Sequence, residues 1–410
     1  MKNRSVVIGL SPNLETDDVL AAAKICCQPW KWKKGEAIKA AEEWFKDYFG
    51  VKTTVSFNAG RSALLAILEG FELPQDSEVM LQAFTCVAVP NSVIWAGLKP
   101  VYVDIDKSLN LDIGDAKRKI TPKTRIVIVQ HTFGVPADMD KVIKFCKQQN
   151  LLLIEDCAHA LGAKYKGKLA GTFGSAAFFS FGRDKIVSSV FGGMATLNQG
   201  SKINNQKLNS YHEKLPYPGY FWIGQQLLHP LISQLALSLY NVLNIGKGML
   251  WLAQRLRLLS FPVYPEEKKS IQPHEFPKRY PNALALLLLN QLKKLEVMNV
   301  RRQEIAEMYR NKLKSAQHVL PENVAGAMNM RFNVLTPRAE ELWNKAKTRG
   351  MILGNWYQHV IDPSGVNLRK VNYIPGSCPN AERIAKESLN LPTYPSITDK
   401  QIEEISRLLN

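Results

Sequence analysis

Short apolar runs alternate with amphipathic stretches through the first half of the chain. Apolar and β-branched runs predict strands at residues 53–57, 78–81, 99–104, 125–130, 151–155 and 176–181. Apolar positions at helical spacing predict helices at residues 17–24, 36–49, 62–70, 87–96, 112–120 and 138–149. Strands that alternate with helices indicate an α/β fold with a mostly parallel central sheet covered on both faces.

The pattern changes after residue 214. Residues 215–265 are rich in Leu, Trp and Tyr and contain no acidic residue, and an amphipathic helix is predicted at 231–245. Further on, the pattern predicts helices at 283–312, 340–349, 380–387 and 398–409, and a strand at 354–357. We therefore expect a large α/β domain (1–214), an apolar helical insertion (215–265) and a smaller C-terminal α/β domain (266–410).

Composition narrows the class of protein. The 410 residues include six cysteines without a C-x-x-C pair, which indicates reduced thiols in a cytoplasmic protein and no metal site. The longest apolar run, residues 283–289, is far shorter than a membrane span. The net charge of +17 suits nucleic acid, an anionic membrane or phosphorylated substrates. Zinc-finger spacing and RNP-type motifs are lacking in the sequence, so nucleic-acid binding is not expected.

Several polar residues follow the ends of predicted strands. Asp156 follows the strand at 151–155, and Gly60, Arg61 and Ser62 lie in the first strand–helix turn. Gln130 and His131 lie at the end of another strand. Ligands of such sheets bind beyond the carboxyl ends of the strands, so these residues are predicted to share one rim.

Lys185 lies in the stretch FFSFGRDKIVSSVFGG, at residues 178–193. A surface turn would leave its ammonium in water, whereas poor solvation would let the amine lose a proton and act as a nucleophile. Lys185, Asp156 and a phosphate site of Gly60, Arg61, Ser62 and Ser180 together meet the needs of pyridoxal phosphate (PLP). That cofactor requires a lysine for its aldehyde, a carboxylate beside its pyridine nitrogen and N–H groups for its phosphate.

Nine segments in one order resemble the DegT/DnrJ/EryC1/StrS family of sugar aminotransferases. They are NAGRSAL (58–64), DSEVMLQAFTCVAVPNSV (76–93), GLKPVYVDID (97–106), HTFGVPADMD (131–140), LLLIEDCAHALGAKYKGKLAGTFG (151–174), FFSFGRDK (178–185), GGMATL (192–197), NQLKKL (290–295) and the C-terminal stretch 375–405. The resemblance implies the aspartate aminotransferase-like fold of PLP-dependent transferases. It covers nearly the whole chain apart from residues 215–265.

The resemblance also implies roles for individual residues. Lys185 would carry PLP and shuttle the proton, and Asp156 would pair with the pyridinium. His159 stands where the family usually has Gln near the cofactor's phenolic oxygen, and Ser180 with the backbone of residues 60–62 would hold the phosphate. Cys86 replaces an aromatic ring that stacks on the cofactor in many relatives. Arg279, after Pro277 in place of Asn, would reach the phosphate of the partner subunit.

The implied activity is transfer of an amino group to a keto-sugar. The family's usual substrates are a nucleotide-linked keto-sugar and glutamate, in surface glycan or deoxyaminosugar synthesis, and its usual assembly is a homodimer. Relatives that remove a hydroxyl carry His in place of Lys185. The altered Cys86, His159 and Pro277 leave open an alternative: a PLP-binding or degenerate member with a regulatory, membrane-associated role.

The insertion at 215–265 allows two interpretations. It is either a helical hairpin that packs on the protein's own dimer, or an interfacial membrane element with Trp222, Tyr240 and Trp251 as belt residues. Packing on the dimer is the favoured interpretation.

Overall fold

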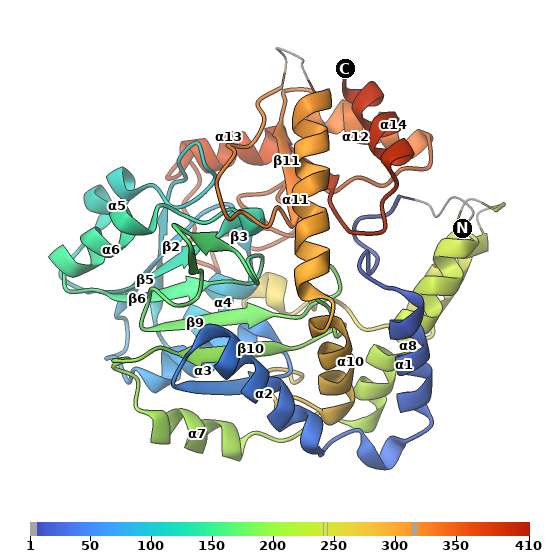
Figure 1. Cartoon of the computed structure of the whole chain (residues 1–410). Coiled ribbons are helices and arrows are strands. Elements are labelled where there is room, and N and C mark those ends of the chain that lie inside the picture. Colours follow the sequence, from blue (N-terminus) through green and yellow to red (C-terminus); the bar gives the residue numbers. More distant parts are fainter. Residues whose placement is uncertain (1–5, 241, 244, 314–317) are drawn as a thin grey trace.

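The computed structural model describes residues 6–240, 242–243, 245–313 and 318–410. Its centre is a seven-stranded sheet in the order β1-β10-β9-β6-β5-β2-β4 (Figure 1). The strands of the first half are β1 (Thr53–Phe57), β2 (Glu78–Gln82), β3 (Thr85–Cys86), β4 (Lys99–Val103), β5 (Thr124–Gln130), β6 (Leu152–Asp156), β7 (Lys164–Tyr165), β8 (Lys168–Leu169), β9 (Ala176–Ser180) and β10 (Gly193–Leu197). Among the described strands of this sheet, β10 alone runs antiparallel to its neighbours.

Helices cover both faces of the sheet, as the sequence predicts. They are α1 (Thr16–Cys26), α2 (Glu36–Phe49), α3 (Gly60–Gly70), α4 (Ala88–Trp95), α5 (Ile113–Lys119), α6 (Met139–Gln148) and α7 (Asn205–Lys214). In β5, Ile126 and Ile128 enter the core beneath α2, α3 and α4, while Val127 and Val129 enter the core beneath α5 and α6. This alternation explains why a strand buried on both faces is apolar at nearly every position.

Local signals in the sequence place most helix ends correctly. Helix α2 covers the predicted residues 36–49 and ends at Gly50, whose φ of 62° is a left-handed conformation that glycine adopts without strain. Asp112, Asp138 and Thr398 cap α5, α6 and α14 (Asp399–Leu409) through their side-chain oxygens.

The C-terminal part forms a second, smaller α/β layer. Its elements are α10 (Asn282–Leu292), α11 (Leu295–Lys312), β11 (Arg331–Leu335), α12 (Ala339–Thr348), β12 (Ile361–Asp362), α13 (Pro379–Glu387), β13 (Ser388–Pro392) and α14. The strands β11 and β13 pair antiparallel over a core of their own. The predicted helix at 283–312 is wrong as a single helix, because the chain breaks at Lys293 and Lys294 between α10 and α11. Residues 354–357 form no strand; only an isolated bridge joins Gly354 to Asn390.

The insertion consists of α8 (Tyr220–Ser238) and α9 (Ile245–Arg255). Helix α8 packs beside α1, and the two lie together at the right of Figure 1. The predicted helix at 231–245 is confirmed for residues 231–238 only, since α8 begins earlier and the chain turns after Ser238; Asn241 and Asn244 lie outside the described residues. Trp222 is also no belt residue, because it is 7% exposed and donates to the Tyr264 hydroxyl at 3.1 Å.

The helices described here are too short or too polar to cross a bilayer. The division into 1–214, 215–265 and 266–410 stays a prediction. Val6 belongs to the C-terminal core, and the Ile8 N–H donates to the carbonyl of Ile352 at 3.1 Å, so the first described residues pack on the C-terminal part.

Gly193 provides a test of how tightly β10 packs on the start of α3. A Cβ at this position would lie 2.5 Å from the backbone nitrogen of Gly60, and backbone cannot move aside cheaply. We expect Gly193→Ala to lower the free energy of unfolding by about 1–3 kcal/mol, measured by urea denaturation. Gly248→Ala is the matched control: open space surrounds Gly248 within α9, so stability there should rise by up to about 1 kcal/mol. Equal stability of Gly193→Ala and the wild type would refute this close contact.

Candidate active site

The register of the central sheet brings the predicted residues to one rim. Asp156 ends β6 opposite Phe178 of β9, and Ser180 ends β9 opposite Gly193 of β10. Gly193 in turn pairs with Phe57 at the end of β1, just before the turn into α3. Lys185 follows β9 in the adjoining turn, so Asp156, Ser180, Lys185 and the start of α3 are neighbours.

Lys185 lies in poorly solvated surroundings. Its Nζ is 4.6 Å from the centroid of the Trp356 ring. Loss of water around the amine lowers the pKa of Lys185, although the nearby carboxylate of Asp184 opposes this change. The backbone is fixed as well, because the Asn13 amide donates to the carbonyl of Lys185 and the buried Arg302 donates to that of Ile186 at 3.0 Å. Residues 183–184 form a turn, as one interpretation of the sequence has it, but Lys185 is only partly exposed and its amine lies against an aromatic ring.

Asp156 is a buried carboxylate close to that amine. Burial raises its pKa, while a hydrogen bond from the Ala158 N–H at 3.0 Å and the charges of Lys185 and His131 oppose this, and the resulting pKa is about 6. At neutral pH the carboxylate is mainly ionised and can accept a hydrogen bond from a protonated nitrogen.

His159 lies among aromatic rings beside this pair. Its ring is parallel to that of Phe133 at 5.8 Å between centroids and to that of Trp356 at 5.6 Å. Burial, with the charges of Lys185 and Arg331, lowers the pKa of His159, so the imidazole is neutral. Since its Nδ1 accepts from the Phe133 N–H at 3.3 Å, its Nε2 carries the proton and donates to the Tyr357 hydroxyl at 3.4 Å.

The start of α3 forms a tight cradle. Helix α3 begins at Gly60, and a Cβ there would lie 2.9 Å from Cβ of Ser180. The first N–H groups of a helix lack acceptors within it, which favours an anion at this place. The Arg61 guanidinium is not aimed at such an anion, because it pairs with the buried Glu267 and donates to the Pro262 carbonyl at 2.8 Å. The Ser62 hydroxyl donates to the Asn58 side chain at 2.9 Å.

Cys86 and Arg279 are the remaining predicted residues. Cys86 lies in β3 beside Asp362 of β12, and burial raises the pKa of its thiol although the charges of Arg61 and Lys185 oppose this. The Arg279 guanidinium donates to the carbonyl of His212 at 3.1 Å, within its own chain. Its contact with a partner subunit stays a prediction.

Comparison with a family profile shows to which protein family the chain belongs. The profile of the DegT/DnrJ/EryC1/StrS aminotransferase family matches residues 13–215 and 252–410. The chain belongs to this family. The resemblance found in the nine sequence segments is thereby confirmed, and so is the PLP-dependent transferase fold. This aminotransferase departs from the profile at residues 216–251, which lie within the predicted insertion.

Named relatives and solved structures agree with the family. GDP-perosamine synthase of Escherichia coli O157:H7 is 26% identical over 390 residues, which are 93% of this aminotransferase and 91% of the relative. PseC of Helicobacter pylori, an aminotransferase involved in the biosynthesis of pseudoaminic acid, has the same fold with a TM-score of 0.75 and 19% identity, over 99% of this chain and 97% of its own. DesV of S. venezuelae, solved with a ketimine intermediate, has a TM-score of 0.71 and 24% identity, over 96% and 93%.

Two residues that lie beside Lys185 in this aminotransferase are not predicted from the sequence. Trp356 presents its ring to Lys185, to His159 and, at 4.0 Å, to the guanidinium of Arg331. Arg331 is buried and pairs with Asp184 at 3.1 Å, directly before the lysine. No spacing in the sequence links residues 184–185 with 331 and 356, since only the packing of the C-terminal part on the sheet joins them.

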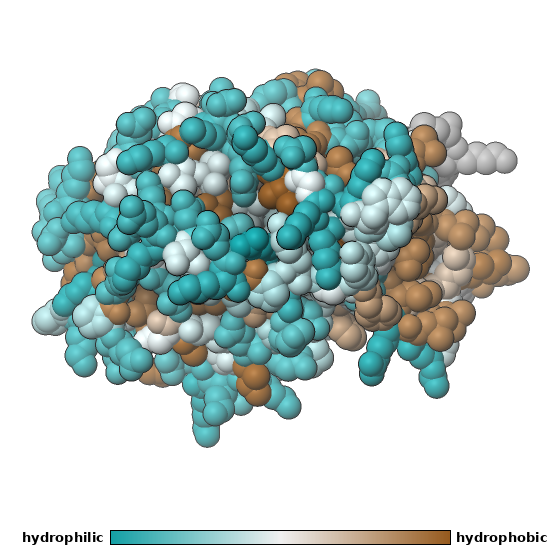
Figure 2. Space-filling model, turned by 90° about the horizontal axis from the view of Figure 1, so that it is seen from below, coloured by the Kyte–Doolittle hydropathy of each residue, from teal (hydrophilic) through white to brown (hydrophobic). Residues whose placement is uncertain are grey.

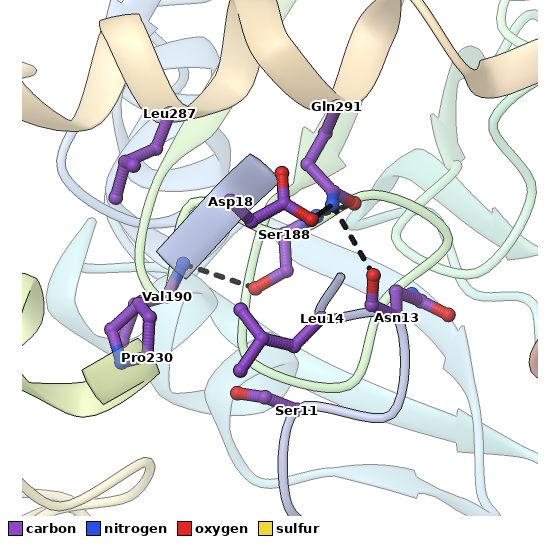
Figure 3. Close-up of a pocket in the computed structure, with 9 residues that line it drawn as sticks. All are labelled: Ser11, Asn13, Leu14, Asp18, Ser188, Val190, Pro230, Leu287 and Gln291. Carbon is purple, nitrogen blue, oxygen red and sulfur yellow. Dashed lines mark hydrogen bonds between the residues drawn. The ribbon is translucent and has the colours of Figure 1, made fainter. Parts of the chain in front are cut away.

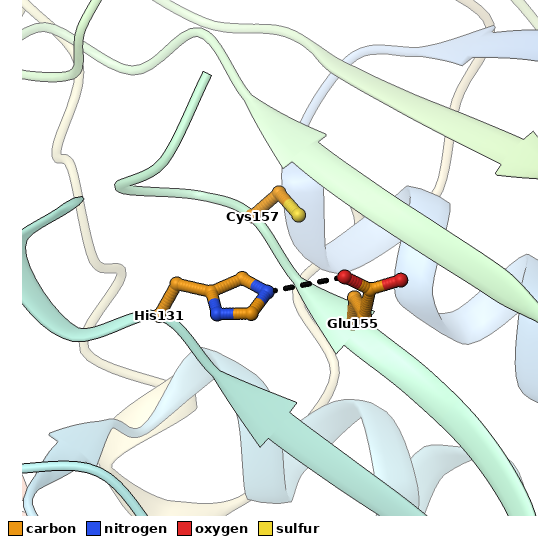
Figure 4. Close-up of side chains that lie close together, drawn as sticks. All are labelled: His131, Glu155 and Cys157. Carbon is orange, nitrogen blue, oxygen red and sulfur yellow. Dashed lines mark hydrogen bonds and ion pairs between the residues drawn. The ribbon is translucent and has the colours of Figure 1, made fainter. Parts of the chain in front are cut away.

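The sequence also gives no warning of a buried cluster of His131, Glu155 and Cys157 (Figure 4). Glu155 accepts from the Gly171 N–H at 2.7 Å and from the Phe173 N–H at 2.6 Å, and it lies 3.2 Å from Nε2 of His131. The other ring nitrogen of His131 accepts from the Ala137 N–H at 3.1 Å. Because these donors and acceptors already satisfy one another, we assign the cluster to holding the strand that carries Asp156.

A small polar cavity supports the segment behind Lys185 (Figure 3). Its volume of about 20 Å³ is enough for a water molecule and too small for a substrate. Gln291 of α10 donates to Asp18 at 2.6 Å and to the Asn13 carbonyl at 3.3 Å across it. Gln291 thus holds the backbone of Asn13, and the Asn13 side chain in turn binds the backbone carbonyl of Lys185.

The raised pKa of Asp156 predicts a pH-dependent stability. The folded value of about 6 exceeds the ordinary 3.8, so the native state binds more protons between these values and its stability falls as pH rises through them. Asn cannot ionise. Without cofactor, Asp156→Asn should therefore match the wild type near pH 4 and exceed it by up to about 3 kcal/mol above pH 6.

Urea denaturation at both pH values measures this difference. Asp47→Asn, at an exposed position of α2, is the control and should show no such pH dependence. A lower stability of Asp156→Asn at high pH would mean that burial of the carboxylate is fully compensated.

Proposed function

We propose that this aminotransferase moves an amino group from glutamate to a nucleotide-linked keto-sugar, with PLP attached to Lys185. The observation that carries the proposal is the amine of Lys185, held with a lowered pKa at the same rim as the buried carboxylate of Asp156. The family and the relatives named above support the reaction class. They give no support to the alternative of a regulatory protein without turnover.

The residues present fit PLP. A Cβ at Gly60 would fill the space against Ser180, so the backbone there can approach a phosphate closely. The N–H groups of residues 60–62 and the Ser180 hydroxyl would hold that phosphate, and ionised Asp156 would hold the pyridine nitrogen in its protonated form. PLP, when bound, supplies an electron sink for the carbon that exchanges the amino group. Trp356 offers the aromatic surface that Cys86 lacks.

Lys185 has two tasks in this scheme. Its lowered pKa makes the unprotonated amine available for covalent attachment of the cofactor. The same amine would also serve to hold and move a proton near the reacting carbons, and the contacts of Asn13 and Arg302 fix the backbone that carries it. Neutral His159 would donate or accept a hydrogen bond near the cofactor's oxygen without adding a charge to the site.

Arg331 is our candidate for binding the carboxylate of the amino donor. It is a buried cation beside Lys185, and its planar guanidinium suits a carboxylate geometrically. In the structure Asp184 occupies the Arg331 guanidinium, so an incoming donor would replace one carboxylate by another.

The partners and place of action are proposals of the same kind. The net charge of +17 suits an acceptor with a diphosphate linker. We propose a homodimer in the cytoplasm, with Arg279 facing the partner's site.

Lys185→Ala tests the proposed cofactor attachment. Wild-type protein mixed with PLP should develop a visible absorbance band that changes when glutamate is added. Lys185→Ala should show only the spectrum of free PLP, because no amine is left at that position. Lys202→Ala, at an exposed lysine, is the control and should keep the band. The same band in Lys185→Ala would reject the assignment.

Arg331→Gln tests donor binding separately. We expect the glutamate concentration at half-maximal rate to rise by about tenfold or more, while the band with PLP persists, since a hydrogen-bonded charge is lost at the donor and not at the cofactor. Arg331→Lys should recover part of the affinity. Arg349→Gln, at an exposed position, should behave as the wild type. An unchanged glutamate dependence in Arg331→Gln would place the carboxylate elsewhere.

A further inference from the structure

Helix α9 carries its large apolar side chains on the side that faces away from the protein. Trp251 is 60% exposed, Leu252 is 49% exposed and Leu256 is 58% exposed. Ile245, Leu252 and Leu256 share one helical stripe by their spacing. We call these four residues the outer face of α9, although Leu256 lies one residue past the end of the helix. Figure 2 shows hydrophobic residues gathered at one corner of the molecule, in contrast to the mixed surface elsewhere in that view.

The side of α9 that packs on the protein is made of small residues. Gly246 and Ala253 are buried, and a Cβ at Gly246 would lie 2.8 Å from Cα of Tyr240, near the end of α8. A helix that needed only to pack on its own domain would direct its Leu and Trp side chains inward. In α9 the small residues face the protein and the large apolar residues face outward. The outer face of α9 is therefore suited to contact an apolar environment outside the protein.

The charged residues of the insertion indicate what this apolar environment is. Residues 215–265 contain no acidic residue, whereas Lys247 and Arg255 are exposed on α9. The Arg255 guanidinium lies 5.4 Å from the Trp251 ring, and Lys247 lies 5.3 Å from the ring of Tyr240. Long basic side chains beside aromatic rings fit the boundary between acyl chains and anionic headgroups. A second copy on a two-fold axis would instead bring like charges together.

Much of the insertion lies outside the family profile. Residues 216–251, which include all of α8 and the first part of α9, lie outside the family profile. Of the outer face of α9, Ile245 and Trp251 lie in this unmatched segment, whereas Leu252 and Leu256 lie in the part that the profile matches.

We propose that the outer face of α9 lies flat on an anionic lipid bilayer, with Lys247 and Arg255 at the headgroups. The helix does not cross the bilayer; it inserts its apolar side to the depth of the headgroup and acyl boundary. This proposal is independent of the chemistry assigned to Lys185. An aminotransferase held in this way works at a membrane surface.

Vesicle sedimentation of the full chain tests the proposal. Wild-type protein should bind vesicles of phosphatidylcholine with phosphatidylglycerol, and bind those of phosphatidylcholine alone far more weakly. The double variant Leu252→Ser, Leu256→Ser should lose about tenfold or more of the binding, because two apolar side chains no longer enter the lipid. Lys247→Ala with Arg255→Ala should lose about tenfold on anionic vesicles only.

Controls separate the possible outcomes. Val297→Ser, at a 76% exposed position of α11, and Lys185→Ala should bind vesicles as the wild type does. The absence of wild-type binding to anionic vesicles, or equal binding by the double Leu variant, overturns the proposal. A double Leu variant that changes the oligomeric state in light scattering, while the wild type ignores vesicles, would show that a second copy covers the face. Lys185→Ala should lose the PLP band and keep vesicle binding, so the failure of one proposal can be told from the failure of the other.

Discussion

Withdrawal of the Lys185 amine from water is the constraint on which the rest of the structure depends. A lysine in water is protonated and inert, so the fold must remove solvent from the amine without losing control of its position. Trp356 covers the amine, Asn13 and Arg302 fix its backbone, and Asp184 and Asp156 offset part of the cost of burial. Each of these neighbours is itself fixed by a further contact, and the cavity bridged by Gln291 belongs to this outer layer.

The same constraint explains the division of labour between neighbouring acidic residues. Glu155 and Asp156 are adjacent on β6 and point to opposite faces of the sheet. Glu155 receives backbone N–H groups from the segment 171–174 and serves the fold. Asp156 accepts one backbone N–H and keeps a raised pKa, which leaves it able to respond to a ligand. A sequence shows two acidic residues in a row, and only the direction of each side chain separates their roles.

Local patterns made most of the fold and part of the candidate site predictable. Strand alternation, the glycine after α2 and the caps of α5 and α6 depend on neighbouring residues, so the sequence places them well. The insertion was misread at 231–245 because its apolar residues occur all round the helices, and the break between α10 and α11 has no proline or glycine to mark it. Trp356 and Arg331 could not be found, because their proximity to Lys185 arises from tertiary packing alone. The roles of Lys185, Asp156, His159, Ser180 and the start of α3 stay predictions whose placement at one rim is consistent with them.

The anchors of Lys185 come from parts of the chain that are made long after it. Arg302 and Arg331 follow the segment they hold by more than a hundred positions, at separations of 116 and 147 residues. A nascent chain that has just exposed the lysine therefore lacks the side chains that shield and fix it. The ε-amine acquires its poorly solvated surroundings only after translation has passed Trp356, whose ring covers it. The surroundings of this lysine are thus completed late in biosynthesis, when the C-terminal half of the chain has folded back onto its first half.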